Sequence, residues 1–294
     1  MGLKKSDRKD LALGICENKN NTYPKRTIAF VLGISEGSLY YEGIQDKKDL
    51  EVKGKIEKEY ETDDTLGPKK LSPLLKMSVG RISRVMLKYD ITPRRKKPPY
   101  RYAGKADDLV GNRLREMDDV ESYEVIFSDI FEFKLDGGSK VYGCFMMRKR
   151  TRQILAFSYS RNMKADLVSG TIKHIYLTKD LKEAEVIFHS DQGKQYGAEI
   201  TVEQLLEYQF ERSMSRAGTP TDNGYAERFV GTFKHAVVER YRYERIEDFA
   251  EFTNKWLNYY NNRRPHQSLG QKSPNEYARE NGLSVVRVLV PNLL

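Results

Sequence analysis

The alternation of apolar and polar residues predicts a sheet in the second half of the chain. Short runs rich in β-branched and aromatic side chains, with no helical period, are typical of strands. Five runs have this character: residues 124–134, 141–147, 153–159, 185–189 and 210–215. Asp136-Gly-Gly-Ser139 separates the first two and predicts a hairpin turn.

Apolar residues three and four positions apart predict the helices that flank this sheet. The segments with this spacing are residues 163–177, 201–208, 222–238 and 246–260. The last of them carries aromatic residues that suit a packed core better than base stacking, namely Phe249, Phe252, Trp256, Tyr259 and Tyr260. The segment 216–223, with Gly218 and Pro220, predicts a flexible loop that orders when DNA and metal bind.

Two helix-turn-helix candidates lie in the first third of the chain. In residues 27–41, Gly33 permits the turn, Ser35 can cap the next helix, and Ser38 and Tyr40 could face DNA. The second candidate, residues 66–91, contains a helix at 78–89. That helix is expected to bury Val79, Ile82, Val85 and Met86 and to present Arg81, Arg84 and Lys88 to DNA. Small helical pairs also often only pack, so the simpler alternative stays open.

The segments around the second candidate are charged. Residues 46–63 are rich in Lys and Glu and predict a solvated helix with opposite-charge pairs. Prolines prevent regular structure in the linker that follows, which carries Arg94, Arg95, Lys96, Lys97, Arg101 and Lys105. This basic strip could follow a DNA groove or act as a solvated spacer, and its charge density favours backbone contact.

These patterns predict six consecutive segments. They are an N-terminal helix-turn-helix at 1–45, a charged connecting helix at 46–65, a second helix-turn-helix-like DNA-binding module at 66–92, a basic linker at 93–106, a catalytic core at 107–280 and a C-terminal tail at 281–294. The tail includes Ser284-Val-Val-Arg-Val-Leu-Val290, for which we expect a strand that pairs with a neighbouring subunit.

The net charge of +9 at pH 7 is unevenly distributed. Residues 1–106 hold 24 Lys and Arg against 14 Asp and Glu, whereas the remaining 188 residues hold 27 against 28. A basic N-terminal part beside a near-neutral core favours binding to nucleic acid. No apolar span, basic amphipathic helix or signal peptide favours a membrane, and the two cysteines, Cys16 and Cys144, lack metal-ligand spacing, so we expect a cytoplasmic protein.

Three acidic residues stand in short motifs of the predicted core. Asp129 interrupts the first strand, Asp191 follows the fourth strand, and Glu227 opens a helix, with 35 residues between Asp191 and Glu227. Carboxylate oxygens are the ligands that Mg²⁺ prefers, and three carboxylates can hold two ions that together assist an in-line phosphoryl displacement. On the same helix, Gly231 would let a phosphate backbone approach and Lys234 would present a cation to it.

Each of these acids also has an ordinary structural explanation. Asp129 could be an edge-strand charge, Asp191 an Asx-turn residue, and Glu227 a first-turn acid that complements the helix dipole. Because the chain has 42 acidic residues, the combination of the three motifs, rather than any one of them, favours catalysis.

The motifs together resemble the integrase-core transposases of bacterial insertion sequences, over roughly residues 20–280. The residues that carry the resemblance are Phe127-Ser-Asp-Ile130, His189-Ser-Asp-Gln-Gly193, Ser213-Met-Ser-Arg-Ala-Gly218, Asp222-Asn-Gly-Tyr-Ala-Glu227, Tyr260-Asn-Asn-Arg-Arg-Pro-His266 and Leu269-Gly270. They are most similar to the downstream-frame product of the family whose two overlapping frames are fused by ribosomal frameshifting. Two departures, Phe-Ser before Asp129 and Gly224-Tyr225 before Ala226, leave the three acids intact.

The resemblance implies an α/β fold, the RNase H-like core of retroviral integrases with a mixed five-stranded sheet flanked by helices. It maps a DDE triad onto Asp129, Asp191 and Glu227 and a basic DNA-contacting position onto Lys234. It also implies a copy-out route through a circular intermediate and a homo-oligomer that joins two DNA ends. Arg216 in the loop and Arg264 after the last predicted helix are further DNA-contact candidates, although Arg264 could instead close the core.

The sequence therefore predicts a transposase that works at the nucleoid. It would bind double-stranded DNA at terminal inverted repeats and at a target, and use two Mg²⁺ ions, which Mn²⁺ could replace, to nick a 3′ end and transfer it. Two alternatives remain: an RNase H-like nuclease or junction resolvase, which cuts without joining, and a DNA-binding regulator that does not use its core.

Overall fold

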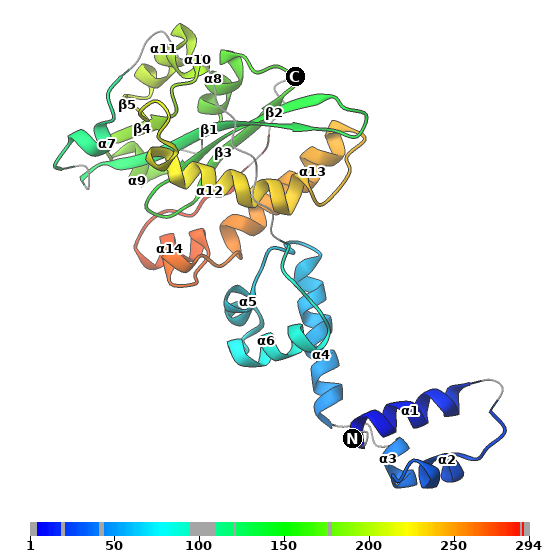
Figure 1. Cartoon of the computed structure of the whole chain (residues 1–294). Helices are drawn as coiled ribbons and strands as arrows, with labels where there is room; N and C mark the ends of the chain where they lie inside the picture. Colours follow the sequence, from blue (N-terminus) through cyan, green and yellow to red (C-terminus); the bar gives the residue numbers. More distant parts are fainter. Residues whose placement is uncertain are drawn as a thin grey trace. The chain divides into compact units, whose positions relative to one another are not determined.

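The computed structural model describes residues 5–18, 21–40, 44–94, 110–119, 122–175, 178–288 and 290 of the 294-residue chain. These residues form two compact units, Met1–Lys55 and Ile56–Leu294. The boundary falls inside helix α4 (Ile44–Tyr60), and we describe each unit by itself (Figure 1).

The first unit contains the helices α1 (Lys5–Glu17), α2 (Lys25–Val31) and α3 (Glu36–Tyr40). Their small core consists of Ala12, Ile28, Ala29, Ile34 and Leu39. Gly33 has φ +64°, a conformation that glycine adopts without strain, so it makes the predicted turn between α2 and α3. The helix pair is confirmed, and α1 is a third helix that the sequence pattern had not indicated.

The second unit begins with the end of α4 and a helical pair, α5 (Pro68–Leu75) and α6 (Val79–Lys88). The Ser78 side chain caps α6 by accepting a hydrogen bond from the Arg81 backbone N–H, at 3.4 Å. Burial of Ile82, Val85 and Met86 is confirmed, but the same expectation for Val79 is wrong because its side chain, in the first turn, is 39% exposed. Helix α4 is not wholly solvated either, since Ile56 is buried.

The larger part of this unit is built on the predicted mixed sheet of five strands, in the order β3-β2-β1-β4-β5. The strands are β1 (Glu124–Lys134), β2 (Lys140–Arg148), β3 (Ile154–Ser160), β4 (Val186–Ser190) and β5 (Phe210–Met214). The first three are antiparallel neighbours, whereas β4 and β5 run parallel to β1. Gly137 and Gly138, both with φ +86°, make the hairpin turn between β1 and β2.

Helices cover both faces of the sheet (Figure 1). One face carries α8 (Ala165–Lys173), α10 (Lys194–Gly197) and α11 (Glu199–Glu207). The other carries α12 (Gly224–Phe233), its π-helical continuation η3 (Lys234–Val238) and α13 (Ile246–Asn262). The short helices α7 (Arg113–Glu116) and α9 (Lys179–Lys182), the 3₁₀ turns η2 (Pro220–Asn223) and η4 (Gln267–Leu269), and α14 (Pro274–Glu280) complete the elements.

Aromatic side chains fill the space between β1–β3 and the helices α12 and α13. Phe131 contacts Phe233 with ring centroids 5.3 Å apart, and Phe133 contacts Phe249 at 4.3 Å. Trp256 is 1% exposed, so the expectation that the α13 aromatics are core residues is confirmed for it and for Phe249.

The C-terminal tail corrects an expectation. Residues 283–288 form no strand; instead Val286 and Val288 are 2% exposed and belong to the main core. The Asn275 side chain exchanges two hydrogen bonds with the Val286 backbone, at 2.8 and 2.9 Å. The backbone groups that were expected to pair with another subunit are therefore partly used within the chain. Among the described residues, no helix is long and apolar enough to cross a membrane.

Candidate active site

The two aspartates are brought together by the pairing of β1 with β4. The last paired residues of these parallel strands are Phe127 and His189, so continuing the register by two residues puts Asp129 level with Asp191. Neighbouring strands lie about 4.8 Å apart. Side chains alternate between faces, and since Phe127 packs on Tyr225 of α12, Asp129 points to the α12 face.

Asp191 lies one residue beyond β4, in a tight turn that explains the glycine of its motif. Its Oδ1 accepts a hydrogen bond from the Gly193 N–H at 3.0 Å. A Cβ at position 193 would lie only 3.0 Å from that oxygen and 3.1 Å from Oε1 of Gln195. Glycine therefore allows the backbone to approach and orient the carboxylate, as an Asx turn does.

Glu227 comes from a different kind of element, the first turn of α12. It is exposed and lines a cavity of about 990 Å³. Partial burial raises its pKa. The glutamate is therefore more open to solvent than the aspartates.

Mutual repulsion among the carboxylates shows in the pKa values. Burial and the charges of Asp191 and Glu227 raise the pKa of Asp129 to about 8, against the opposing effects of the Ile130 N–H and Lys234. Burial also raises the pKa of Asp191. Buried like charges of this kind favour a bound cation, and carboxylate oxygens suit Mg²⁺, so the aspartate pair fits that metal.

Glu227 does not form a metal-binding group with Asp129 and Asp191. Within the described part of the chain, no group of three or more His, Cys, Asp or Glu side chains is arranged to hold a metal ion. The charge of Glu227 nevertheless raises the pKa of Asp129, so Glu227 lies near the two aspartates.

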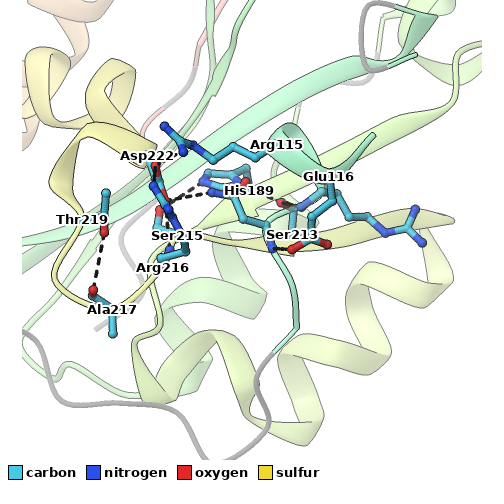
Figure 2. Close-up of polar contacts among 11 residues, drawn as sticks. Arg115, Glu116, His189, Ser213, Ser215, Arg216, Ala217, Thr219 and Asp222 are labelled. Carbon is cyan, nitrogen blue, oxygen red and sulfur yellow. Dashed lines mark hydrogen bonds and ion pairs between the residues drawn. The ribbon is translucent and has the colours of Figure 1, made fainter. Parts of the chain in front are cut away.

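The loop before α12 is held by Asp222, whose side chain is 1% exposed (Figure 2). Its carboxylate accepts hydrogen bonds from Asn112 at 2.9 Å and from the Arg216 guanidinium at 3.0 Å, and it pairs with Arg115 at 3.2 Å. Hydrogen bonding with Arg216 is the main cause that lowers the pKa of Asp222 to about 2. Hydrogen bonds and ion pairs to Asp222 therefore hold the segment that was expected to be a flexible loop, and its last residues form the turn η2.

His189 and Asn223 link this loop region to the strands that carry the aspartates. His189 hydrogen-bonds through Nδ1 to Ser213 at 2.8 Å and through Nε2 to Ser215 at 3.0 Å (Figure 2). Burial lowers the pKa of His189 to about 4, so the ring is neutral near pH 7. The Asn223 amide donates to the Ser128 carbonyl at 3.2 Å, next to Asp129.

Sequence reasoning had missed these supporting roles. The residues stand inside the motifs that carried the family resemblance, at His189-Ser, Ser213-Met-Ser215 and Asp222-Asn223. Their place in the motifs was the signal that could have indicated these supporting roles. Tyr225, which departs from the family pattern, packs on Phe127 and lies under Arg152, whose guanidinium carbon is 3.9 Å from the ring centre.

The structure places only some of the expected DNA contacts near the carboxylates. Lys234 lies in η3, close enough to Asp129 to lower its pKa, and its Nζ is 5.7 Å from the centre of the Phe131 ring. Arg216 is half exposed but paired with Asp222. Arg94 donates a hydrogen bond to the Glu239 carbonyl.

The remaining candidates lie elsewhere. Arg84 and Lys88 are exposed on α6, and Arg81 is half-buried. In the first unit Ser38 is half-buried and donates a hydrogen bond to the Ser35 carbonyl, while Tyr40 is 61% exposed with Lys25 Nζ 5.0 Å from its ring centre. Four candidates fall outside the described residues: Arg95, Lys96, Lys97 and Arg101.

Arg264 requires a correction. Its side chain is 4% exposed and pairs with the fully buried Asp63 at 2.7 Å, with a further hydrogen bond to Thr65 at 3.3 Å. A guanidinium held in this way ties the α4–α5 connection to the core, so the structure supports the alternative in which Arg264 closes the core.

Two family models agree with this site. Both are described as integrase core domain, and they match residues 119–220 and 208–274. Asp129 and Asp191 fall within the first match and Glu227 within the second. The mixed sheet and these matches confirm the RNase H-like core of integrases.

Named relatives include transposases of bacterial insertion sequences. The chain is 28% identical to an uncharacterized transposase-like protein of Haemophilus influenzae, over 71% of this chain and 96% of that protein. It is 27% identical to a putative transposase of the element IS150 from Escherichia coli, over 61% and 63% of the two chains. It is 30% identical to the IS904 transposase of Lactococcus lactis, over 45% and 52%. The chain thus spans less than two thirds of the last two relatives.

Solved structures with a similar arrangement include a simian T-cell lymphotropic virus intasome in complex with a PP2A regulatory subunit. The TM-score is 0.43 at 11% identity, over 71% of this chain and 74% of that chain. For the catalytic domain of the Mos1 transposase the TM-score is 0.40 at 14% identity, over 53% and 75%.

Proposed function

The chain belongs to the integrase-core transposases of bacterial insertion sequences, a class of DDE polynucleotidyl transferases, and we propose that it nicks and joins DNA at the ends of its element. It would bind the terminal inverted repeats, hydrolyse one phosphodiester at each end, and transfer the resulting 3′ ends to a target. Asp129, Asp191 and Glu227 would carry the chemistry.

The observation that carries this proposal is the parallel pairing of β1 with β4, whose register brings Asp129 level with Asp191 just beyond the end of β4. The raised pKa of Asp129 supports it, because buried carboxylates that repel each other offer a site for divalent cations. Mg²⁺ or Mn²⁺ held by these carboxylates would neutralise charge on the phosphate and on the attacking and leaving oxygens, most fully as a pair of ions.

The side chains of the protein would contribute position and charge rather than a nucleophile. In the first step a water oxygen forms a bond to phosphorus, and the bond to the 3′ oxygen breaks, which frees a 3′-hydroxyl. In the second step that hydroxyl attacks a target phosphate and displaces another 3′ oxygen. Lys234, beside Asp129, would hold the negatively charged backbone.

Joining two ends to one target requires two sites, so we propose that the chain works as a homo-oligomer on DNA. The basic first third of the chain would supply attraction to both terminal repeats and target, including the helix-turn-helix candidates. Such a protein would act at the nucleoid, in the cytoplasm.

The direct test uses purified full-length chain, Mg²⁺, and a labelled duplex that carries the end of the DNA element flanking its gene. The proposal expects a nicked strand and a strand-transfer product. A nick without transfer would support an RNase H-like nuclease or junction resolvase. Binding without either product would support a regulator, and both of these outcomes would overturn the proposal.

A further inference from the structure

We infer that the cavity beside Glu227 is a groove that holds the phosphate backbone of the DNA strand entering the active site, with α12 as one wall and the α5–α6 pair as the other. The inference rests on the proposed function and names where its substrate lies. It also assigns a role to Lys69 and Lys70 of α5, which lie in the DNA-binding module expected at 66–92 but were not among its named contacts.

The α12 wall starts at the catalytic glutamate. Glu227, Gly231 and His235 follow one another at four-residue spacing along the helix, with Arg228 and Thr232 beside them, and all five line the cavity. A Cβ built on Gly231 would meet nothing within 4 Å. The wall is therefore open along the path that leads to Glu227.

The opposite wall comes from the helical pair. Lys69 and Lys70 in the first turn of α5 and Val79 and Ser83 on α6 line the same cavity. Val79 was expected in the core, and its 39% exposure is explained by this position. Arg81, Arg84 and Lys88, the expected DNA contacts of α6, are not among the described lining residues.

Several contacts attach this wall to the core. Arg264 pairs with Asp63 at 2.7 Å, and Arg263 pairs with Glu59 at 3.0 Å. Arg240 donates a hydrogen bond to the Tyr60 carbonyl. The buried Arg264–Asp63 pair and the contacts of Arg263 and Arg240 thus fix the α5–α6 wall relative to the core. The groove is therefore part of the folded structure of this unit.

The charge of the lining selects an anionic ligand. Among the described residues that line the cavity, the basic ones are Lys69, Lys70, Arg94, Arg228 and Arg264, and Glu227 is the single acid. Arg264 is neutralised by its buried pair with Asp63 and Arg94 donates a hydrogen bond to the Glu239 carbonyl, so Lys69, Lys70 and Arg228 carry the positive charge on which the inference rests. The same lining includes no Phe, Tyr or Trp, the groups on which bases stack. The groove therefore suits phosphates rather than bases, and its contribution to binding should not depend on DNA sequence.

The test compares the double variant Lys69→Gln/Arg228→Gln, which neutralises one cation on each wall, with Lys182→Gln, an exposed lysine on α9. All are made in Asp191→Asn so that no cutting occurs, and binding to an element end and to an unrelated duplex is measured against salt concentration. Each phosphate contact contributes about 0.9 to the slope of log K against log salt. We expect the double variant to lower the slope by about two on both duplexes, and Lys182→Gln to leave it unchanged.

The inference would be overturned if the double variant had the same thermal unfolding midpoint as its parent and an unchanged salt slope. A variant that does not fold is replaced by cross-linking: Lys69→Cys is offered a duplex that carries a thiol tether at the scissile phosphate. Its disulfide should form faster than that of Lys182→Cys, and equal rates would also overturn the inference. Neither readout needs catalysis. If the wild-type chain fails to nick DNA but the double variant still lowers the salt slope, the proposed function is rejected and the inference about the groove stands.

Discussion

The two aspartates and the glutamate of the site are positioned by different physical means. Backbone pairing of β1 with β4 sets the level of Asp129, and Asp191 follows directly after β4 in a turn held by the Gly193 N–H. Glu227 depends instead on side chains: Asp222 and Asn223 hold the loop that leads into α12. Backbone pairing in a sheet fixes the relative position of two residues. A helix that follows a loop held by side-chain contacts can still change its position.

This difference has an electrostatic counterpart. Burial raises the pKa of all three carboxyl groups, but the aspartates are more deeply buried than Glu227, whose side chain is exposed. We propose that the glutamate joins the aspartates as a ligand when metal and DNA bind.

Removing a sheet carboxylate should have the largest effect. Asp191→Asn keeps the shape of the side chain but loses a charge at the rigid pair. We expect nicking and strand transfer to fall by at least about 10²–10³-fold, the range for losing one group that stabilises transition-state charge. End binding, followed by fluorescence anisotropy, should stay within about twofold. Wild-type turnover in this variant would remove Asp191 from the site.

Loosening the loop should have a smaller effect. Asp222→Ala removes the acceptor shared by Asn112, Arg115 and Arg216, so Glu227 would be placed less often. Supporting residues around metal ligands typically contribute about 10–100-fold, which is the expected loss of kcat. Initial rates at saturating DNA, and the Mg²⁺ concentration for half activity, would measure it.

The matched control for Asp222 is Asp248→Ala, which breaks the exposed pair between Asp248 and Arg245, at 2.7 Å, on α13. Its activity should equal that of wild type. Equal losses in the two variants would show that the Asp222 network has no special link to Glu227.

Proton release from Asp129 predicts a pH dependence. A carboxyl with a pKa of about 8 is mostly protonated at pH 7, and a cation binds its charged form, so metal binding must displace a proton. Mn²⁺ affinity, measured by calorimetry, should rise by about tenfold per pH unit below pH 8 and level off above it. A flat profile between pH 6 and pH 8 would show that Asp129 is already ionised.

The same raised pKa affects stability with the opposite trend. When a chelator removes metal ions, the folded state holds this proton more tightly than the unfolded state, in which the pKa of the carboxyl has its ordinary value of 3.8. The stabilising contribution is complete below about pH 4 and is lost as pH rises through about 8. Asp129→Asn should therefore gain stability relative to wild type as pH rises, in thermal denaturation at several pH values.

Crowding the Asp191 turn should have the smallest effect. Gly193→Ala would bring a methyl group to 3.0 Å from Asp191 Oδ1, and overpacking of this kind costs about 1–3 kcal/mol. We expect about a tenfold loss of nicking with little change in the placement of Glu227. The control is Gly54→Ala in α4, where a Cβ would meet nothing within 4 Å, and it should leave the nicking activity unchanged. Equal activity of the two variants would show that the turn tolerates a side chain.

Local patterns were sufficient for most elements. The runs at 124–134 and 210–215 became β1 and β5 within one residue of their expected ends, because strand-forming side chains and flanking turn residues act locally. The helix expected at 163–177 is shorter, Ala165–Lys173, since helix ends depend on neighbours as well as on periodicity. The tail failed as a strand because its valines found the chain's own core.

The sequence by itself determined the three carboxylates, the helix that carries Glu227, the turn glycine beside Asp191 and the family, since these depend on residue type and short spacing. Only the tertiary structure decided that Asp129 lies level with Asp191, because strand register joins residues far apart in the chain. It also decided that Asn112 holds Asp222 and that Arg264 is buried against Asp63, 110 and 201 positions away. Partners at such separations leave no local pattern, so packing alone selects them.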